Sequence, residues 1–336
     1  MPHPTIPGAR RRATVRDVAA AAGVATSTVS RVFSRPERIS APTRQHVLAV
    51  AGRLGYRPDP IAQALPSGST RTLALLVPDI TNPFFFDLIR GAERQAAAAE
   101  FTLVLADAGE SADAESLHLD RLTRSVDGVV LASSRLPGTR IEALRLERPL
   151  VLVNRKSAGV PAVVVDNHQG MAQAAAHLAS LGHERVGYAG GPESSWSDRT
   201  RWRALQAAAR RLGLTCVRLG AFPPTIDGGT AVAETALVAR VSAVVAFNDL
   251  LAIGAMRRLG RRGVAVPGGM SVLGCDDIFG AEICAPALTT VAADIELAGR
   301  TAIDLLLAQR SAIPPPARTI VLQTHLTIRQ STGGPR

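Results

Sequence analysis

Polar side chains stand directly after several short apolar runs, and these are the residues whose types could bind a small molecule. The pairs in question are Pro78-Asp79, Ser133-Ser134, Asn154-Arg155, Asn248-Asp249 and Asp276-Asp277. One polar pair after an apolar run is ordinary loop chemistry. Five pairs that converge on one place indicate a binding site for a small polar molecule.

The apolar runs have the length of buried strands and alternate with amphipathic stretches of helical period. Predicted strands lie at 73–77, 103–106, 129–132, 150–154, 163–166, 186–189, 244–247 and 272–275, and predicted helices include 85–99, 170–181, 202–211 and 250–259. Strands separated by helices indicate parallel sheets. There are too many strands for one small sheet, so two similar lobes are expected. Ligands of such sheets bind at the carboxyl ends of the strands, where the polar pairs stand.

The positive charge of the chain is concentrated at its N-terminus. Residues 1–71 hold eleven arginines against three acidic residues, so they carry +8 of the net charge of +10 and leave +2 for the other 265 residues. Such segregation is typical of a surface that contacts nucleic-acid phosphates.

Three short helices are predicted in this basic segment. Thr14 is a candidate N-cap for the first helix, Gly23 supplies the turn to the second, and the third begins near Ser40 and runs to about Leu54. The apolar positions at helical spacing are Val15, Val18, Ala19, Ala22, Val29, Val32, Phe33, Val47, Leu48, Ala51 and Leu54. Two helices joined by a tight turn with glycine indicate a helix-turn-helix.

The amino-acid sequence of these segments resembles that of the lactose-repressor (LacI/GalR) family. In the head the matching stretches are Thr14–Ala19, Ala22–Val24, Thr28–Val32, Ser40–Arg44 and Leu54–Pro58. In the remainder they are Val77–Phe85, Asp127–Leu131, Leu181–Val186, Asn248-Asp249, Val272–Asp277 and Pro286–Val291. The resemblance runs from about residue 14 to residue 332.

The resemblance implies an N-terminal all-α helix-turn-helix head and an α/β two-lobed, periplasmic-binding-protein-like body with parallel sheets. The expected parts are a disordered basic arm (1–13), a helix-turn-helix domain (14–58), a hinge helix with a linker (59–71), and an effector-binding and dimerisation domain (72–332). The lobes of the last part are expected at about 72–165 plus 292–318 and at 166–291 plus 319–332.

The resemblance also implies a set of DNA-contacting residues: Thr14, Thr26, Ser27, Thr28, Ser30, Arg31, Arg35, Tyr56 and Leu65. The second helix is expected in the major groove with Thr26, Ser27 and Arg31 at base edges, where a bidentate contact of Arg31 to guanine is worth ~1–3 kcal/mol. A solvated helix start is the alternative for Thr26 and Ser27. Ala25 stands where the family usually has a serine cap.

A hinge helix is expected to begin at Asp59 as N-cap with Pro60 in its first turn, and it is too short to hold alone in water. Leu65 stands at the family's wedge position, where a side chain opens a base step from the minor groove. Ordinary packing in a linker is the alternative. Pro66 departs from the family, and proline disfavours the helical conformation at the residue before it.

The resemblance, carried over position by position, also implies a set of effector-binding residues: Asp79, Phe84, Ser133, Asn154, Arg199, Phe222, Asn248 and Asp276. Arg199 and Asp276 can each engage two hydroxyls, and Phe84 can stack on a ring, so a sugar-like effector is expected. A surface ion pair is the alternative for Arg199, and a loop-capping carboxylate is the alternative for Asp276. The alignment at Phe222 is loose.

Other classes of protein fit the sequence poorly. There is no phosphate-binding glycine loop, nucleophile elbow or metal-ligand spacing, so neither an enzyme nor a cofactor is expected. The three cysteines have no CxxC spacing. No apolar run reaches the ~18 residues of a membrane span. The prediction is a cytoplasmic, nucleoid-associated homodimeric repressor that binds a near-palindromic operator and a small effector. A regulator without ligand control, an activator and, remotely, a solute-binding protein stay open as alternatives.

Overall fold

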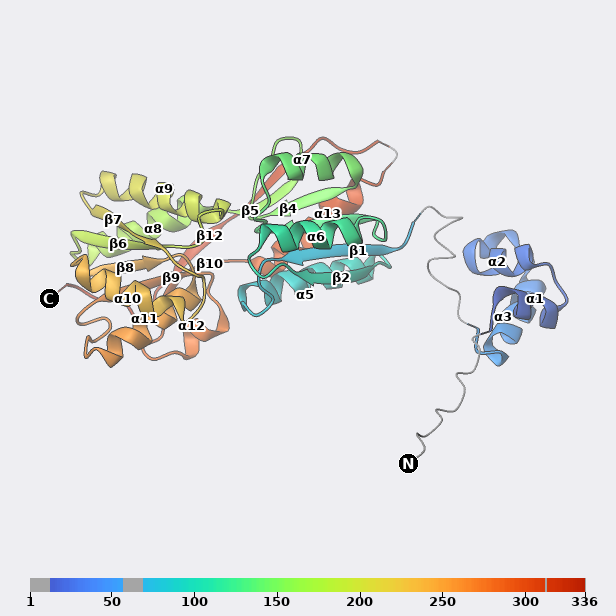
Figure 1. Cartoon of the computed structure of the whole chain (residues 1–336), viewed down its shortest axis with the longest axis horizontal. Helices are drawn as coiled ribbons and strands as arrows, with labels where there is room; N and C mark the ends of the chain where they lie inside the picture. The colour runs from blue at the N-terminus through green and yellow to red at the C-terminus, as the bar shows by residue number, and fades with distance from the viewer. Residues whose placement is uncertain (1–12, 57–68, 312, 336) are drawn as a thin grey trace, which may run out of the picture. The chain divides into compact units, whose positions relative to one another are not determined.

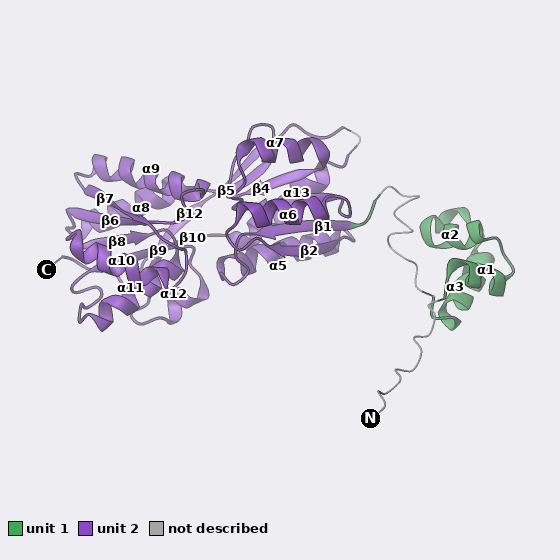
Figure 2. Ribbon diagram, in the orientation of Figure 1, with its two compact units in different colours: residues 1–71 green, residues 72–336 purple. Residues whose placement is uncertain are grey.

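The computed structural model describes residues 13–56, 69–311 and 313–335. The chain divides into two compact units, residues 1–71 and residues 72–336 (Figure 2). The expected basic arm, the hinge helix and Leu65 lie outside the described residues.

The first unit, called the head below, is a small helical domain. It contains α1 (Val15–Ala22), α2 (Thr26–Ser34), a 3₁₀ turn (Pro36–Arg38) and α3 (Ala41–Arg53). Thr14 and Asp17 form a capping box at the start of α1, and Gly23 ends that helix at φ 63°. The predicted apolar positions largely form the core, with Val18, Val29 and Val47 fully buried. The head is therefore the expected helix-turn-helix.

The first lobe of the second unit, called the body below, is built on a parallel sheet. Its order is β11-β5-β4-β3-β1-β2, formed by β1 (Thr72–Val77), β2 (Thr102–Asp107), β3 (Gly128–Ala132), β4 (Leu150–Val153), β5 (Ala162–Val165) and β11 (Thr319–Leu322). One apolar core lies under α5 (Phe84–Ala98) and α13 (Ile295–Ala308). A second core lies under α6 (Ala112–Leu122) and α7 (Gly138–Glu147). Helices thus cover both faces of the sheet (Figure 1).

The second lobe repeats this plan. Its sheet has the order β12-β10-β9-β8-β6-β7, formed by β6 (Arg185–Gly190), β7 (Thr215–Ala221), β8 (Ala243–Ala246), β9 (Ser271–Cys275), β10 (Thr289–Ala293) and β12 (Thr324–Thr327). The pair β10 and β12 is antiparallel. The helices are α8 (Asn167–Ser180), α9 (Trp196–Arg211), α10 (Gly228–Val238), α11 (Asp249–Arg261) and α12 (Phe279–Ile283). The predicted two-lobed α/β fold is confirmed.

Within the described residues the chain passes between the lobes at three single residues. Asp166 separates β5 from α8, Asp294 separates β10 from α13, and Gln323 separates β11 from β12. The first and third passages are linked by a hydrogen bond, because the Thr324 hydroxyl donates to the Asp166 carbonyl at 2.9 Å.

The predicted lobe boundary at residue 319 is wrong. Strand β11 begins at Thr319 and pairs with β5 in the first sheet, with Ile320 opposite Val163, so the chain enters the second lobe only after Leu322. A four-residue strand does not reveal its partner, because pairing with β5 joins residues more than 150 positions apart.

No helix in the described part of the chain is long and apolar enough to cross a membrane.

Candidate functional site: a cavity between the lobes and an exposed helix in the head

The outward face of α2 is the exposed polar surface of the head. Val29 and Val32 turn inward, which leaves Thr26, Ser27 and Arg31 exposed at helical spacing. The helix begins without a side-chain cap, because Ala25 has no side-chain acceptor. A hollow on this surface is lined by Ser27, Ser30, Arg31, Ser34, Arg35 and Arg38. Such a surface offers hydroxyl and guanidinium donors but no carboxylate.

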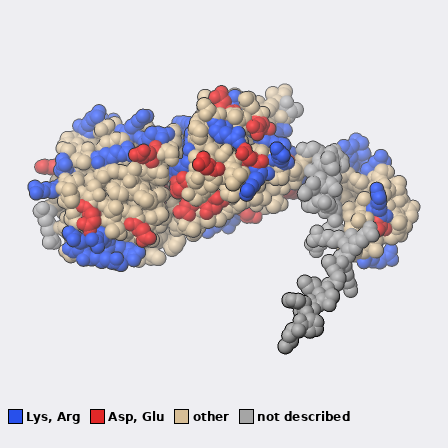
Figure 3. All heavy atoms as spheres, viewed as in Figure 1, with Lys and Arg blue, Asp and Glu red and all other residues tan. Residues whose placement is uncertain are grey.

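The other predicted DNA contacts of the head lie around α2. Thr14 is exposed and caps α1, Thr28 is half-buried, and Arg35 is exposed just after α2. Tyr56 packs its ring 5.6 Å from that of Phe33. The described part of the head holds seven arginines against two acidic residues, and its visible face in Figure 3 carries several basic side chains.

A cavity lies between the carboxyl ends of the two sheets in the body. Its lining comes from both lobes: Pro78, Asn82, Phe84, Phe85, Glu110, Ser133, Arg135, Asn154, Ser195, Ser197, Arg201, Pro224, Phe247, Asn248 and Asp276. Its volume is about 30 Å³, room for little more than a water molecule. A metabolite therefore enters only when the lobes or the lining side chains move apart.

Five predicted effector residues line this cavity, namely Phe84, Ser133, Asn154, Asn248 and Asp276. Ser133 and Asn154 follow β3 and β4 with φ of 48° and 53°, and Asp276 follows β9 with φ of 115°. Such left-handed backbone is costly for residues other than glycine and clusters where function requires it. The sharp turns begin the loops that carry the polar side chains.

Three predicted effector residues do not line the cavity. Asp79 accepts from the backbone N–H and the hydroxyl of Thr81, at 2.8 and 2.6 Å, and so closes its own loop. Phe222 packs against the core of the second lobe. Arg199 is exposed and donates to the Glu193 carbonyl at 3.0 Å. In this arrangement of the lobes the cavity is therefore built without these three side chains.

Arg201 supplies the buried guanidinium that sequence reasoning assigned to Arg199. Two residues of helix turn a side chain through about 200°, so Arg199 and Arg201 point to opposite sides of α9. The face that packs on the sheet carries Ser197, Arg201, Ala204, Leu205 and Ala208. The helical phase of Leu205 and Ala208 was the available signal, because Arg201 lies four residues before Leu205.

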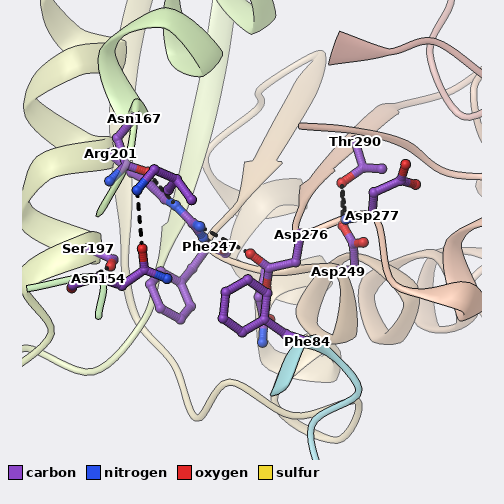
Figure 4. Close-up of polar contacts among 12 residues, drawn as sticks. Phe84, Asn154, Asn167, Ser197, Arg201, Phe247, Asp249, Asp276, Asp277 and Thr290 are labelled. Atoms are coloured by element: carbon purple, nitrogen blue, oxygen red, sulfur yellow. Dashed lines mark hydrogen bonds and ion pairs between the residues drawn. The ribbon is translucent and has the colours of Figure 1, made fainter. Parts of the chain in front are cut away.

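Arg201 makes a different contact with each of its three nitrogens (Figure 4). Nε donates to Asn167 Oδ1 at 3.1 Å, Nη1 donates to the Phe247 carbonyl, and Nη2 donates to Asp276 Oδ1 at 3.0 Å. Both side chains of the ion pair are 7% exposed. Burial raises the pKa of Asp276 to about 6 even though the guanidinium opposes the shift. The pair is ionised at neutral pH but close to titration.

Two further groups hold the rim of the second lobe. Asn248 caps α11 by accepting from the Leu251 N–H at 3.0 Å, and its Nδ2 donates to the Pro224 carbonyl at 3.0 Å. Asp249 accepts from Thr290 Oγ1 at 2.6 Å and from the Ile278 N–H at 2.9 Å, so it pins both sides of the loop that carries Asp276. Burial, and next the charge of Asp276, raise the pKa of Asp249 well above its usual range.

Contacts also cross between the lobes at the cavity. Ser197 on α9 donates to the Asn154 carbonyl of the first lobe at 3.3 Å. The Asn154 side chain accepts from the Val165 N–H at 3.3 Å and so braces the end of β5. Sequence reasoning missed Ser197, Glu110 and Arg135, because nothing in the local pattern separates them from ordinary loop or helix residues.

Two family models match the chain: "Bacterial regulatory proteins, lacI family" at residues 14–59 and "Periplasmic binding protein-like domain" at residues 175–332. The chain is 33% identical to the HTH-type transcriptional repressor CytR of Escherichia coli (strain K12) over 95% of this chain and 96% of that protein. It is 32% identical to the HTH-type transcriptional regulator DegA of Bacillus subtilis (strain 168) over 96% and 98%.

Solved structures match over both units. The transcriptional regulator CelR–cellobiose complex aligns with a TM-score of 0.71 and 30% identity over 95% of this chain and 100% of that one. The lac repressor dimer bound to operator and the anti-inducer ONPF aligns with a TM-score of 0.84 and 24% identity, over 96% and 100%, which shows the shared fold.

Proposed function

The chain belongs to the lacI family of bacterial regulatory proteins, and we propose that it is a repressor whose hold on operator DNA is set by a small polar metabolite between its lobes. The observation that supports DNA binding most directly is the outer face of α2. There Thr26, Ser27 and Arg31 are exposed on a helix whose inner side, Val29 and Val32, is fixed in the head core. A helix presented in this way fits the major groove.

The other head residues take supporting roles in this proposal. Arg35, with Thr14 and the hydroxyls of Thr28 and Ser30, meets backbone phosphates, which fix register without reading sequence. Tyr56 braces the head core through Phe33. Leu65 acts as the wedge in the minor groove.

The cavity supports control by a sugar-like effector. Its lining combines Phe84 as an apolar ring with Asp276 and Asn154 as hydrogen-bonding groups, which is the composition of a site for a polyhydroxylated molecule. The relative solved with cellobiose agrees with this class. Binding favours one arrangement of the lobes over another, and that differential affinity is what couples the cavity to the DNA.

We propose further that the protein works as a homodimer in the cytoplasm, associated with the nucleoid, and catalyses no reaction. A solved structural neighbour is a dimer on its operator. Two heads related by a twofold axis require a near-palindromic operator with two matched half-sites.

The test is selection of bound duplexes from a random pool by the full chain, followed by titration at several salt concentrations. We expect a near-palindromic sequence bound at about 10⁻⁸ M or tighter, with affinity that falls steeply as salt rises. Arg31→Ala is expected to weaken binding about tenfold or more and to relax the preference at one base of each half-site. The matched control is Arg211→Ala, at the exposed end of α9. The proposal fails if no sequence is enriched or if both variants bind alike.

A further inference from the structure

Arg135 is a buried cation at the cavity wall, and no role was predicted for it from the sequence. It lies just after β3, its side chain is 4% exposed, and it lines the cavity. Nε donates to Glu110 Oε2 at 2.7 Å. Glu110 follows β2, and β1 lies between β2 and β3 in the sheet, so the pair spans the end of β1. The loop that carries Glu110 is fixed there by a bond from the Glu110 N–H to the Pro78 carbonyl at 2.6 Å.

The backbone around Arg135 is held rigidly. Its own N–H donates to Glu115 Oε2 at 2.8 Å, and Glu115 is buried. The Ser134 carbonyl accepts from Arg155 Nη1 at 2.7 Å, and the Ser133 N–H donates to the Val153 carbonyl at 2.8 Å. Such bracing is what a residue needs in order to contact a ligand without reorganisation.

The two arginines of the cavity differ in the number of N–H donors that remain free to bind a ligand. Each of the three nitrogens of Arg201 donates a hydrogen bond to a protein acceptor. In the part of the chain that the structure describes, Arg135 uses only Nε, and neither Nη1 nor Nη2 has a protein acceptor. Up to four N–H donors of Arg135 are therefore available at the wall of the cavity.

The charges of the cavity are balanced in pairs. Four of the described lining residues are ionisable, and Arg135 pairs with Glu110 just as Arg201 pairs with Asp276. A phosphate or carboxylate on the effector would add an uncompensated negative charge beside Glu110 or Asp276. A hydroxyl or ring oxygen accepts from Arg135 without that cost.

We propose that Arg135, held by Glu110, is a specificity-determining residue of the effector site, and that the charge-balanced cavity selects an uncharged polyhydroxylated molecule over its phosphorylated form. This inference rests on the proposed function, since it assumes that the cavity is the effector site. The effector hydroxyls accept from Arg135 in the first lobe and donate to the free oxygen of Asp276 in the second. One molecule thereby contacts both lobes.

The experiment is isothermal titration of the full chain with D-ribose, D-glucose, D-galactose and cellobiose, and with ribose 5-phosphate, glucose 6-phosphate and galactose 6-phosphate. At least one uncharged sugar is expected to bind. Where a sugar that binds has its phosphate in the panel, the phosphate is expected to bind at least tenfold more weakly. Arg135→Gln is expected to weaken binding of the sugar tenfold or more, because it removes a cationic donor. Arg140→Gln, at a part-exposed ion pair with Asp120 in the same lobe, is the matched control and is expected to leave affinity unchanged.

Two further variants separate recognition from folding. Glu110→Gln leaves the positive charge of Arg135 uncompensated, so the preference for the sugar over its phosphate is expected to shrink or reverse. A purely structural role for the pair would not move that preference. Glu110→Gln combined with Arg135→Gln removes both charges, avoids a part-buried carboxylate without a cation, and is expected to fold and still bind the sugar weakly.

The proposal is overturned if a sugar phosphate binds as tightly as its sugar, or if Arg135→Gln and the double variant stay within twofold of the unmodified protein. It is also overturned if no uncharged sugar binds while the selected operator is still bound, in which case the DNA-binding role stands. Loss of operator binding in the unmodified protein would instead refute the proposed function.

Discussion

Replacing Arg201 by methionine tests whether the cavity is built as described. Methionine fills much of the space of the arginine stem but donates no hydrogen bond. The change strips donors from Asn167 Oδ1 and the Phe247 carbonyl, at about 1 kcal/mol each, and leaves the buried Asp276 carboxylate without its cation. Removal of one partner of a buried ion pair costs about 3–5 kcal/mol in all. The free energy of unfolding is expected to fall by that amount at neutral pH.

The cost is expected to depend on pH, because Asp276 can relieve it by taking up a proton. The pKa of Asp276 is about 6 with Arg201 in place and rises further without it. Between those two values the variant binds a proton that the unmodified protein does not, so the difference in stability grows by about 1.4 kcal/mol for each unit that the pH rises. Below pH 6 the carboxyl is protonated in both proteins, and only the loss of about 2 kcal/mol from the neutral hydrogen bonds remains.

Urea unfolding of both proteins at pH 5.5 and pH 7.5, followed by circular dichroism, measures this difference. The control is Arg199→Met, because Arg199 is exposed and makes one contact to a carbonyl, and its change is expected to stay within about 0.5 kcal/mol. Equal losses in the two variants, or a larger loss at the lower pH for Arg201→Met, would refute the reasoning.

Three other outcomes are expected. Effector affinity is expected to fall as the pH drops through about 6, because protonation of Asp276 removes an acceptor for ligand hydroxyls; titrations from pH 5 to pH 8 check this, and Asp276→Asn should bind weakly with no such step. Thr14→Ala removes the capping box with Asp17 and is expected to lower the stability of the head by about 1 kcal/mol, measured by thermal melting, with Thr102→Ala in the body as a control that leaves the head unaffected. Leu65→Ala is expected to weaken operator binding and leave effector binding intact, and equal operator affinities would argue against the wedge.

The lobes of the body were predictable because their central strands are continuous apolar runs. The eight predicted strands match β1–β6, β8 and β9 to within about two residues at either end. The missed strands are edge or near-edge elements. Strand β7 mixes Val217 and Leu219 with the polar Arg218 and lies at the sheet edge, so its run is broken. Strands β11 and β12 have four residues each, and long-range pairing alone decides which sheet they join.

The residues that line the cavity could be predicted where their place at the end of a strand puts them there. They were harder to predict where the direction of the side chain determines whether it faces the cavity. Ser133, Asn154 and Asp276 were found because they follow β3, β4 and β9 directly. Arg199 was named from the resemblance alone, which does not show that its side chain lies on the opposite side of α9 from Arg201. Arg135 could not be found from local pattern, since its role depends on Glu110, which reaches it from the loop after another strand.

The single-residue passages at Asp166, Asp294 and Gln323 limit the ways in which the lobes can move. Each residue contributes two soft backbone torsions, so about six dihedral angles separate one lobe from the other. Asp166 caps α8 and Asp294 caps α13, so the backbone torsions at these residues are coupled to the helices that follow them. A torsion change at either residue therefore turns a whole helix. We therefore expect a change in the angle between the lobes to turn α8 and α13 as whole helices, and α13 packs against α5 in the core of the first lobe.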